Sequence, residues 1–372
     1  MRRYLPLFFG YFTVMALSNA IVPVLPAYSP DASAHGLIYA GYFLGAFFVT
    51  LPAGILTDRY GRIPFVRLGL FVSLASGAFL TLISDPVLVI AGRFLEGTGA
   101  GLFVAAAMAM VNADPGHVRL SGWLMASQNA GLVTGLAIAG WLAAYLGTPP
   151  SGIALFTLML VVPAVASLLV REPAGTPGTA GISGREILRI TRHHRWLWYS
   201  TVVIIGLTGL VTALYPKLSG AGSGQLGIWI AMMGIATIIA VIASSRMAPE
   251  PVLAIRWGAI LMAGGVVLLF FSPAGFLMIG AVAGIVIISQ MAFLAGAAGN
   301  QGTVMGLYSS FAYLGMALLP AAGGLCADRL GFPAAFFIAV LAALSVAATI
   351  GRCACVTAGE TYGILPARNN KQ

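Results

Sequence analysis

The sequence predicts an all-α integral membrane protein with twelve transmembrane helices, arranged as two pseudo-symmetric six-helix bundles. Three observations predict this class. Hydrophobic residues make up 59% of the 372 residues and charged residues only 8%, whereas a soluble domain carries about 25% charged residues. Apolar runs close to the ~20 residues that cross a bilayer recur along the chain. A glycine-rich pattern of the first half also recurs in the second half.

The apolar runs are separated by short turns or polar connections, and each predicts one span. The predicted spans are 4–27, 36–56, 65–84, 86–111, 118–146, 151–170, 196–218, 224–243, 252–271, 273–296, 302–325 and 333–351. The first run follows Arg2 and Arg3 and continues to Pro26 without a small-residue cleavage pattern. We therefore interpret it as a first span rather than a signal peptide.

The basic residues predict the orientation of these spans. With the N-terminus in the cytoplasm, sixteen of the nineteen Lys and Arg residues fall in cytoplasmic segments. Lys217 and Arg329 fall on the opposite side, and Arg93 lies within a span. Because cytoplasmic loops of membrane proteins are enriched in Lys and Arg, we expect both termini in the cytoplasm. We expect a multi-pass protein of the plasma membrane, with the lipid bilayer as its main partner.

A polar stretch divides the chain. The predicted parts are an N-terminal six-helix bundle (1–171), a cytoplasmic linker (172–195), a C-terminal six-helix bundle (196–351) and a cytoplasmic tail (352–372). The linker begins with loop-forming proline and glycine residues at 173–178, and residues 185–190 mix basic and apolar side chains. Two structures fit that second part: a short helix lying along the membrane surface and a loose basic connector.

The two halves share a sequence pattern. Residues 131–140 align with residues 315–324 at an offset of 184, and the same offset places Leu146-Gly147 on Leu330-Gly331. A similar offset, about 186, places the second span over the eighth. A common offset predicts that the halves arose as repeats of one six-helix unit.

The segment Gly54-Ile55-Leu56-Thr57-Asp58-Arg59-Tyr60-Gly61-Arg62 lies between the second and third spans. Its Gly, Leu, Asp-Arg, Gly and basic positions resemble the cytoplasmic loop signature of the major facilitator superfamily. The resemblance implies a secondary transporter whose substrate site lies between the halves near the bilayer midplane. It also implies that this segment latches the cytoplasmic side shut. The candidate latch residues are Gly54, Asp58, Arg59, Gly61 and Arg62.

A physical role can be given to each type in that segment. Gly61 permits a tight reversal, and Asp58 can accept from Arg59 or Arg62 or lie against the positive N-terminal end of a helix. The resemblance implies that this helix is the eleventh span, beginning near Gly302. The alternative is that the charges only anchor the loop. The equivalent loop of the second half, 244–248, lacks the Asp and the Gly, so any latch is expected to depend on the first half.

The fourth span contains Arg93-Phe94-Leu95-Glu96-Gly97, which resembles a fourth-helix pattern of the family in which the Arg is tied to proton coupling. At ~1.5 Å per residue from Pro86, Glu96 lies ~15 Å into a ~30 Å core. A carboxylate there is costly, so it either pairs with Arg93 one turn away or is protonated. We predict Glu96 and Arg93 as the proton-coupling residues; the alternative is a fixed structural ion pair.

The fifth span contains Gly131, Gly135 and Gly140. They resemble the antiporter motif of the family's drug exporters, although Leu136 and Ala139 replace part of that motif. A proline stands at the equivalent place of the eleventh span, Pro320. The resemblance implies a hinge that favours export, and close helix packing by small residues is the alternative. Residues 23–26 of the first span also resemble an exporter pattern.

Polar and aromatic side chains within the spans are candidates for the substrate cavity. The predicted cavity residues are Asn19, Gln128, Asn129, Gln290, Tyr308 and Tyr313. Tyr11, Tyr42 and Trp123 are further aromatic candidates, although membrane-interface anchoring explains many such residues.

The predicted function is secondary active transport, and proton-coupled export of small apolar or cationic molecules is favoured over import of a small metabolite. The proton is the expected coupling ion, and we expect a monomer that needs no cofactor or metal. An enzyme would need more polar groups than Arg93 and Glu96. ATP is excluded as an energy source because no phosphate-binding loop is present. Nucleic-acid binding is excluded because the basic residues are dispersed among short connections.

Overall fold

The computed structural model describes residues 4–112, 114, 117–170, 184–247, 249–297 and 301–351, although a few side chains within this part are not described. This part is helical and contains no strand. Its elements are α1 (Leu5–Ala20), η2 (Val22–Ala27), α2 (Ala32–Tyr60), α3 (Ile63–Leu82), α4 (Pro86–Asn112), α5 (His117–Leu146), α6 (Ser151–Ser167), α7 (Gly184–His193), α8 (Arg195–Ser219), α9 (Ser223–Met247), α10 (Pro251–Phe271), α11 (Gly275–Ala297), α12 (Gln301–Leu330) and α13 (Phe332–Thr349).

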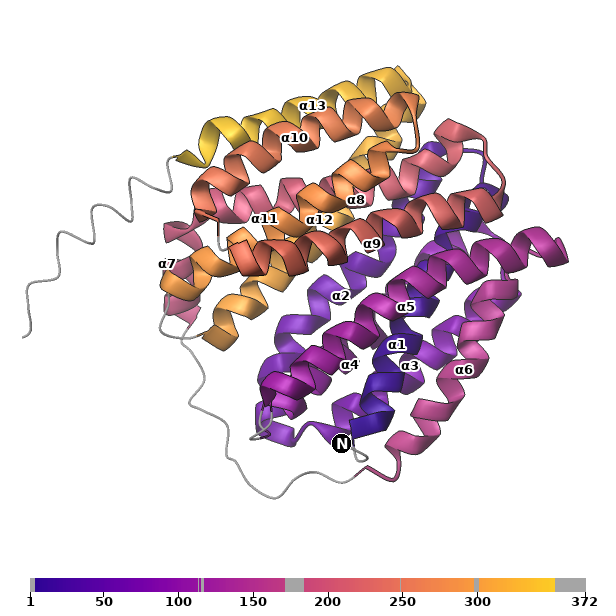
Figure 1. Cartoon of the computed structure of the whole chain (residues 1–372). Coiled ribbons are helices and arrows are strands. Elements are labelled where there is room, and N and C mark those ends of the chain that lie inside the picture. The colour runs from indigo at the N-terminus through magenta and orange to yellow at the C-terminus, as the bar shows by residue number, and fades with distance from the viewer. Residues whose placement is uncertain are drawn as a thin grey trace, which may run out of the picture.

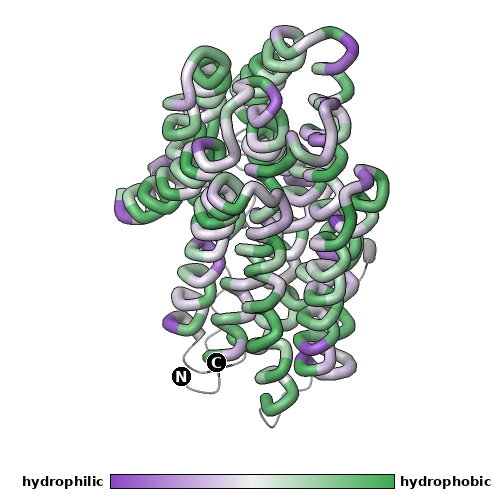
Figure 2. Tube along the Cα trace, turned by 90° about the vertical axis from the view of Figure 1, so that its right-hand side faces the viewer, coloured by the Kyte–Doolittle hydropathy of each residue, from purple (hydrophilic) through white to green (hydrophobic). Residues whose placement is uncertain are grey.

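The described helices confirm the predicted membrane fold. Eleven segments are long and apolar enough to cross a bilayer, with α1 and η2 together forming the first. The apolar helix α6 has 17 residues, which at ~1.5 Å per residue is ~25 Å, near the lower limit for a span. Figure 2 shows long hydrophobic stretches along the helices. With α6 counted, the described part of the chain contains the twelve expected spans.

Several helix bounds differ from the prediction, and the sequence explains the clearest difference. The predicted first span, 4–27, divides into the α-helix α1 and the 3₁₀-helix η2. Pro23 and Pro26 lie in η2, and proline lacks the N–H that an α-helix needs and clashes with the preceding turn. Three other helices are several residues longer than predicted: α2 begins at Ala32, α9 continues to Met247 and α12 continues to Leu330.

The linker contains a helix in its described part. The helix α7 has ten residues and carries Arg192 and His193 in its last turn, which confirms the helical alternative for residues 184–193. Its position on a membrane surface stays a prediction. The first part of the predicted linker and the predicted tail (352–372) lie outside the described residues.

Equivalent helices of the two halves make equivalent contacts. In the first half α1 packs against α5 and α2 against α4; in the second half α8 packs against α12 and α9 against α11. Between the halves, α2 packs against α12 and α5 against α9. These four helices lie at the centre of the molecule in Figure 1. The contacts confirm two pseudo-symmetric bundles.

The repeated glycines explain the close packing within each half. A Cβ atom on Gly131 of α5 would lie 2.3 Å from the carbonyl oxygen of Phe12 in α1. A Cβ atom on Gly315 of α12 would lie equally close, 2.3 Å, to the carbonyl oxygen of Val202 in α8. Only glycine permits such an approach of two backbones. The sequence offset of 184 residues therefore corresponds to the same helix contact in both halves.

The same correspondence holds between the halves. Gly140 of α5 faces Ser223 at the start of α9, and a Cβ atom would lie 2.4 Å from the Ser223 carbonyl oxygen. Gly324 of α12 faces Ala32 at the start of α2, again with 2.4 Å to the carbonyl oxygen. Glycine therefore occupies both crossings at which the bundles meet most closely.

The two sides of the bundle differ in how tightly the halves meet. We call the side on which α1 begins the N-terminal side and the opposite side the far side. On the far side, a Cβ atom on Gly36 of α2 would lie 2.1 Å from the carbonyl oxygen of Pro320 in α12. Towards the N-terminal side, the nearest described atom to a Cβ on Gly306 is 3.7 Å away on Leu51, and none lies within 4 Å of one on Gly54. Among the described residues, the halves therefore pack more tightly at Gly36 on the far side than at Gly306 and Gly54.

Candidate functional site

A buried ion pair lies in the middle of α4. The Arg93 guanidinium donates to Glu96 Oε2 at 2.5 Å, and both side chains are 1% exposed. The two residues are one helical turn apart, so α4 alone brings them together. The other carboxylate oxygen, Glu96 Oε1, has no hydrogen-bond partner among the described residues. The predicted pairing is therefore present, with one oxygen of Glu96 left unsatisfied.

Arg93 also connects α4 with α2. Its Nε donates to the carbonyl oxygen of Ile38 at 3.4 Å, and its guanidinium carbon lies 4.8 Å from the centroid of the Tyr42 ring. The two helices approach closely here. A Cβ atom on Gly97 would overlap the carbonyl oxygen of Tyr42. The Arg93 side chain therefore contacts both Glu96 on its own helix and the backbone of α2.

Aromatic side chains extend from this ion pair towards the second half. The rings of Tyr42 and Phe43 lie 5.0 Å apart, and that of Phe43 lies 6.1 Å from Tyr313 of α12. Tyr39, one turn before Phe43 in α2, lies 5.0 Å from it and places its hydroxyl beside Thr212 of α8. This aromatic cluster (Tyr39, Tyr42, Phe43 and Tyr313) joins the two halves next to the buried charges.

The other predicted cavity residues occupy two different environments. Asn19, Gln128 and Asn129 are half-buried, and the amides of Asn19 and Asn129 donate to carbonyl oxygens one turn earlier in their own helices. Gln290 and Tyr308, in contrast, are buried. The structure therefore separates Gln290 and Tyr308 from the half-buried candidates of the first half.

Gln290 belongs to a fully hydrogen-bonded group. Its Nε2 donates to Ser200 Oγ of α8 at 2.9 Å, and its Oε1 accepts from the Tyr308 hydroxyl of α12 at 3.2 Å. Three helices of the second half are tied together by this one side chain. Such satisfied buried groups stabilise a core, which is the simplest role for Gln290 and Tyr308.

The structure describes only part of the predicted latch. Gly61 ends α2 with φ of 86°, a conformation that favours glycine, and Arg62 precedes α3. The side chains of Asp58 and Arg59, and those of the first residues of α12, lie outside the described residues. The predicted contact between Asp58 and the eleventh span stays a prediction.

Close packing, the alternative role of the motif glycines, is present in the structure. Gly131 and Gly135 lie against α1, Gly140 lies against α9, and the carbonyl oxygen of Pro320 faces Gly36. The side chain of Pro320 also lies beside Gly209 of α8, 3.2 Å from a Cβ atom there. A role of these residues as a hinge that favours export stays a prediction.

A charged contact between the halves is present that the sequence did not predict. The backbone N–H groups of Ala32 and Ser33, at the start of α2, donate to the Asp328 carboxylate of α12 at 2.9 and 2.7 Å. Lys217 of α8 forms a salt bridge with Asp328 at 3.4 Å. Between η2 and α2, burial raises the pKa of Tyr28 to about 12.

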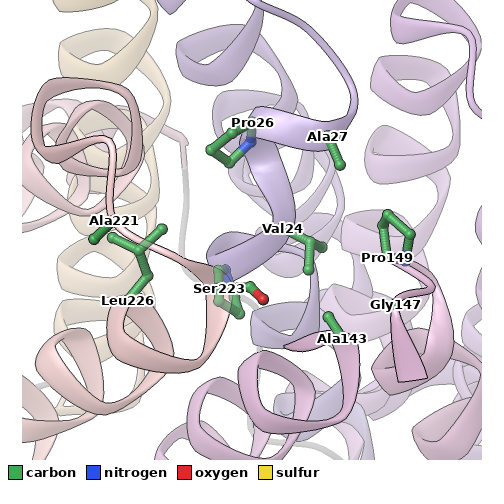
Figure 3. Close-up of a pocket in the computed structure, with 10 residues that line it drawn as sticks. Val24, Pro26, Ala27, Ala143, Gly147, Pro149, Ala221, Ser223 and Leu226 are labelled. Carbon is green, nitrogen blue, oxygen red and sulfur yellow. The ribbon is translucent and has the colours of Figure 1, made fainter. Parts of the chain in front are cut away.

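A small pocket lies between the halves on the far side. It has a volume of about 180 Å³ and is lined mainly by apolar residues, among them Val24 of η2, Ala143 of α5 and Leu226 of α9. Figure 3 shows the polar side chain of Ser223 at the same place. None of the predicted cavity residues lines it. The pocket lies between η2, the C-terminal end of α5 and the N-terminal end of α9.

The fold is that of a polytopic membrane protein with buried polar groups within its spans, and the comparisons identify a transporter rather than an enzyme. Comparison with known families agrees: the model of the Major Facilitator Superfamily matches residues 7–319. The chain therefore belongs to the major facilitator superfamily.

Individual relatives match shorter parts of the chain. The proline/betaine transporter of Escherichia coli K12 is 31% identical over 178 residues, which are 43% of this chain and 35% of that protein. The MFS-type transporter criB of Aspergillus cristatus is 29% identical over 134 residues, which are 36% of this chain and 29% of that protein. The matches thus cover about a third of the length of these relatives.

Solved structures share the fold over nearly the whole chain. A bacterial homologue of the human lysosomal transporter Spinster, in an inward-facing and occupied conformation, gives a TM-score of 0.74 at 12% identity and covers 95% of this chain and 96% of that one. The nucleoside transporter NupG gives 0.72 at 11% identity, with 94% and 99% covered. The human organic anion transporter MFSD10 gives 0.69 at 17% identity, with 94% and 99% covered.

Proposed function

We propose that this protein is a proton-coupled exporter of small apolar or cationic molecules that works by alternating access. The observation that carries the proposal is the buried Arg93–Glu96 pair, which lies in the middle of a transmembrane helix and contacts a helix at the interface between the halves. On the predicted orientation, the N-terminal side is cytoplasmic and the described conformation faces inward.

Glu96 can carry the proton because two states of its carboxyl group fit the site. When ionised, it is balanced by Arg93. When protonated, it no longer needs a cation, and a neutral carboxyl group is much cheaper to bury in the membrane than a carboxylate. The unsatisfied oxygen Oε1 is a position that can accept a proton without displacing Arg93 first.

Proton binding is connected to the interface between the halves through α2. A protonated Glu96 binds the guanidinium of Arg93 less strongly, because the charge attraction is lost. Arg93 also contacts Ile38 and Tyr42 of α2, and α2 packs against α12 of the second half. The charge of Glu96 therefore affects the position of α2, whose contacts with α12 differ between the two sides of the protein.

The substrate class follows from the surroundings of this pair. The aromatic cluster offers ring faces, which attract cations and apolar molecules. One carboxylate is available to balance one positive charge, and it becomes available when Arg93 releases it. Competition between a substrate cation and a proton for Glu96 is the simplest form of antiport.

Import is the second candidate, and one finding favours it. A relative with 31% identity over 178 residues is named for the transport of proline and betaine, both of which carry a positively charged nitrogen and a carboxylate. Arg93 and the aromatic cluster together offer partners for both charges. The two candidates share the site and differ in the direction of net flux.

The experiment is transport by purified protein in liposomes, with a pH gradient imposed in either direction. Radioactive proline and betaine and a set of lipophilic cations serve as substrates. Glu96→Gln should abolish gradient-driven movement of these substrates. Glu250→Gln is the matched control, because Glu250 caps the start of α10 at an exposed position and should transport normally. Gradient-driven transport by Glu96→Gln at the normal rate would overturn the proposal.

A further inference from the structure

We propose that Asp328 and the end of α12 form a second latch, which holds the far side closed, and that it is built like the segment from Gly54 to Gly61. This inference rests on alternating access, but it does not depend on proton coupling or on the direction of transport. The far-side latch is defined as the segment from Gly324 to Gly331 together with the N-terminal turn of α2.

The two segments share a sequence pattern at an offset of 270 residues. Gly54, Asp58-Arg59 and Gly61 correspond to Gly324, Asp328-Arg329 and Gly331. In both, the Asp-Arg pair lies at the end of a long helix, and the glycine follows two positions after the Arg. The backbone agrees as well, since Gly61 has φ and ψ of 86° and 161° and Gly331 has 86° and 162°.

The contact made by Asp328 shows what this pattern does. The start of α2 has unpaired backbone N–H groups, as every helix does, and its own N-cap residue, Asp31, makes no capping hydrogen bond. The carboxylate of Asp328 in the other half accepts from Ala32 and Ser33 instead. A negative charge at a helix N-terminus is also favoured by the helix dipole.

This arrangement is unusual within the described part of the protein. Asp85 caps α4, and Glu250 caps α10, each from the residue next to its own helix. Only for α2, among these three helices, does the capping carboxylate come from the opposite bundle. The cap therefore exists only while the far-side ends of α2 and α12 are together.

The close packing around Asp328 depends on the same approach. Gly324 faces the Ala32 carbonyl oxygen, and Gly36 faces that of Pro320, so backbones meet on both sides of the cap. Lys217 adds a salt bridge to Asp328 at 3.4 Å, with both side chains about a third exposed. Water can reach these groups when the halves part, so the latch can open without leaving buried charges unpaired.

Each latch joins the end of one helix to the start of the other, and the two helices exchange these roles between the latches. Asp328 lies in the last turn of α12 and caps the start of α2. Asp58 lies near the end of α2 in the sequence and is predicted to lie against the start of α12. If one contact holds each side closed, the two cannot form together, and the protein alternates between them.

The test measures the opening of both sides by distances between spin labels on a background without the native cysteines. One pair, at Leu82 and Phe271, spans the far side. The other, at Leu169 and Met247, spans the N-terminal side. All four side chains are exposed in the structure, so labels do not disturb the packing. Because the measurement needs no substrate, it stays informative even if the proposed transport direction or coupling is wrong.

Asp328→Ala should increase the ratio of far-side-open to far-side-closed protein about two- to thirtyfold, the range for replacement of a capping side chain by alanine. The far-side distance should lengthen while the other shortens. Lys217→Gln should act in the same direction with a smaller effect. Asp85→Ala, which removes a cap on the same side within one half, should change neither population. Unchanged distances in both Asp328→Ala and Lys217→Gln would overturn the proposal, as would an equal shift in Asp85→Ala.

Discussion

Gly61 and Gly331 lie 270 residues apart and share one backbone conformation, with φ of 86° in both. Each directly follows a long helix that ends in an Asp-Arg pair, although one belongs to the first half and the other to the second. The start of α2 contacts Asp328 at the end of α12, so these neighbouring helices run antiparallel and the two turns lie on opposite sides of the protein. Closure on either side can therefore use the same local structure.

The Arg93–Glu96 pair predicts strong coupling between the two residues in stability. Arg93→Gln leaves a buried carboxylate without its cation, which costs ~3–5 kcal/mol if the carboxylate stays ionised. Adding Glu96→Gln removes that charge, so the double variant should be more stable than Arg93→Gln alone. Thermal unfolding in detergent of the wild type, both single variants and the double variant measures the coupling.

A double variant whose loss of stability equals the sum of the two single losses would contradict this account of the pair. The pH dependence offers a second check. Arg93→Gln should regain stability as the pH falls, because protonation neutralises the unpaired carboxylate.

The close approach on the far side predicts a conformational effect of one methyl group. Gly36→Ala places a Cβ atom within overlap of the Pro320 carbonyl oxygen, so the far-side-closed conformation should be disfavoured. We expect a larger far-side-open population. It should be seen as higher reactivity of a cysteine placed at Val24, which is buried on that side. The reactivity towards a membrane-impermeant maleimide should rise several-fold.

Gly122→Ala, in α5, is the matched control for that variant. No described atom lies within 4 Å of a Cβ at Gly122, and alanine is favoured over glycine in a helix by ~1 kcal/mol. Gly122→Ala should therefore leave the Val24 cysteine protected. Equal protection in Gly36→Ala would show that the far-side contact does not limit opening.

Arg67 predicts a purely structural contribution on the N-terminal side. Its guanidinium donates to the carbonyl oxygens of Ser167, Leu168 and Val170 at 3.0–3.2 Å, which ends the short helix α6. Arg67→Ala should lower the stability by ~1–3 kcal/mol, because these bonds involve a charged donor. Thermal unfolding measures the loss. Arg119→Ala, an exposed arginine at the start of α5, should change stability little, and an equal effect would contradict this role.

The two environments of the cavity candidates predict different phenotypes. Gln290→Leu removes two hydrogen bonds within the second half and should lower the melting temperature while substrate affinity stays the same. Tyr313→Ala, in the aromatic cluster, should weaken substrate binding at least tenfold with a smaller change in stability. Binding by isothermal calorimetry and unfolding on the same samples separate the two; a large loss of affinity in Gln290→Leu would place it in the cavity instead.

Much of the fold could be predicted because the bilayer restricts it. Long apolar runs, short turns and the repeat at residues 131–140 and 315–324 led to twelve spans in two related bundles. The pairing of Glu96 with Arg93 was also predictable, since residues three apart share a helix face and a charge in the membrane needs a partner.

The inter-half contacts were harder to predict from the sequence. The role of Asp328 depends on which helix ends meet across the interface, and only the packed structure shows this. The loop that follows the second span of the second half, residues 244–248, lacks the Asp and Gly of the segment from Gly54 to Arg62. A search for the same spacing anywhere in the chain would have found it at Gly324–Gly331. Similarly, the sequence does not show that both ends of the Gln290 amide are hydrogen-bonded within the second half; its place in the cavity stays a prediction.

The most direct test of the account is the pH dependence of the two spin-label distances in wild-type protein and in Glu96→Gln. The described conformation contains the Arg93–Glu96 ion pair, so it should be favoured when Glu96 is ionised. As the pH falls, the wild type should shift towards the far-side-open conformation, with the Leu82–Phe271 distance lengthening and the Leu169–Met247 distance shortening. Glu96→Gln should show the low-pH populations at every pH. A wild type whose distances do not change with pH, or a Glu96→Gln variant that still responds as the wild type does, would contradict the central role of Glu96.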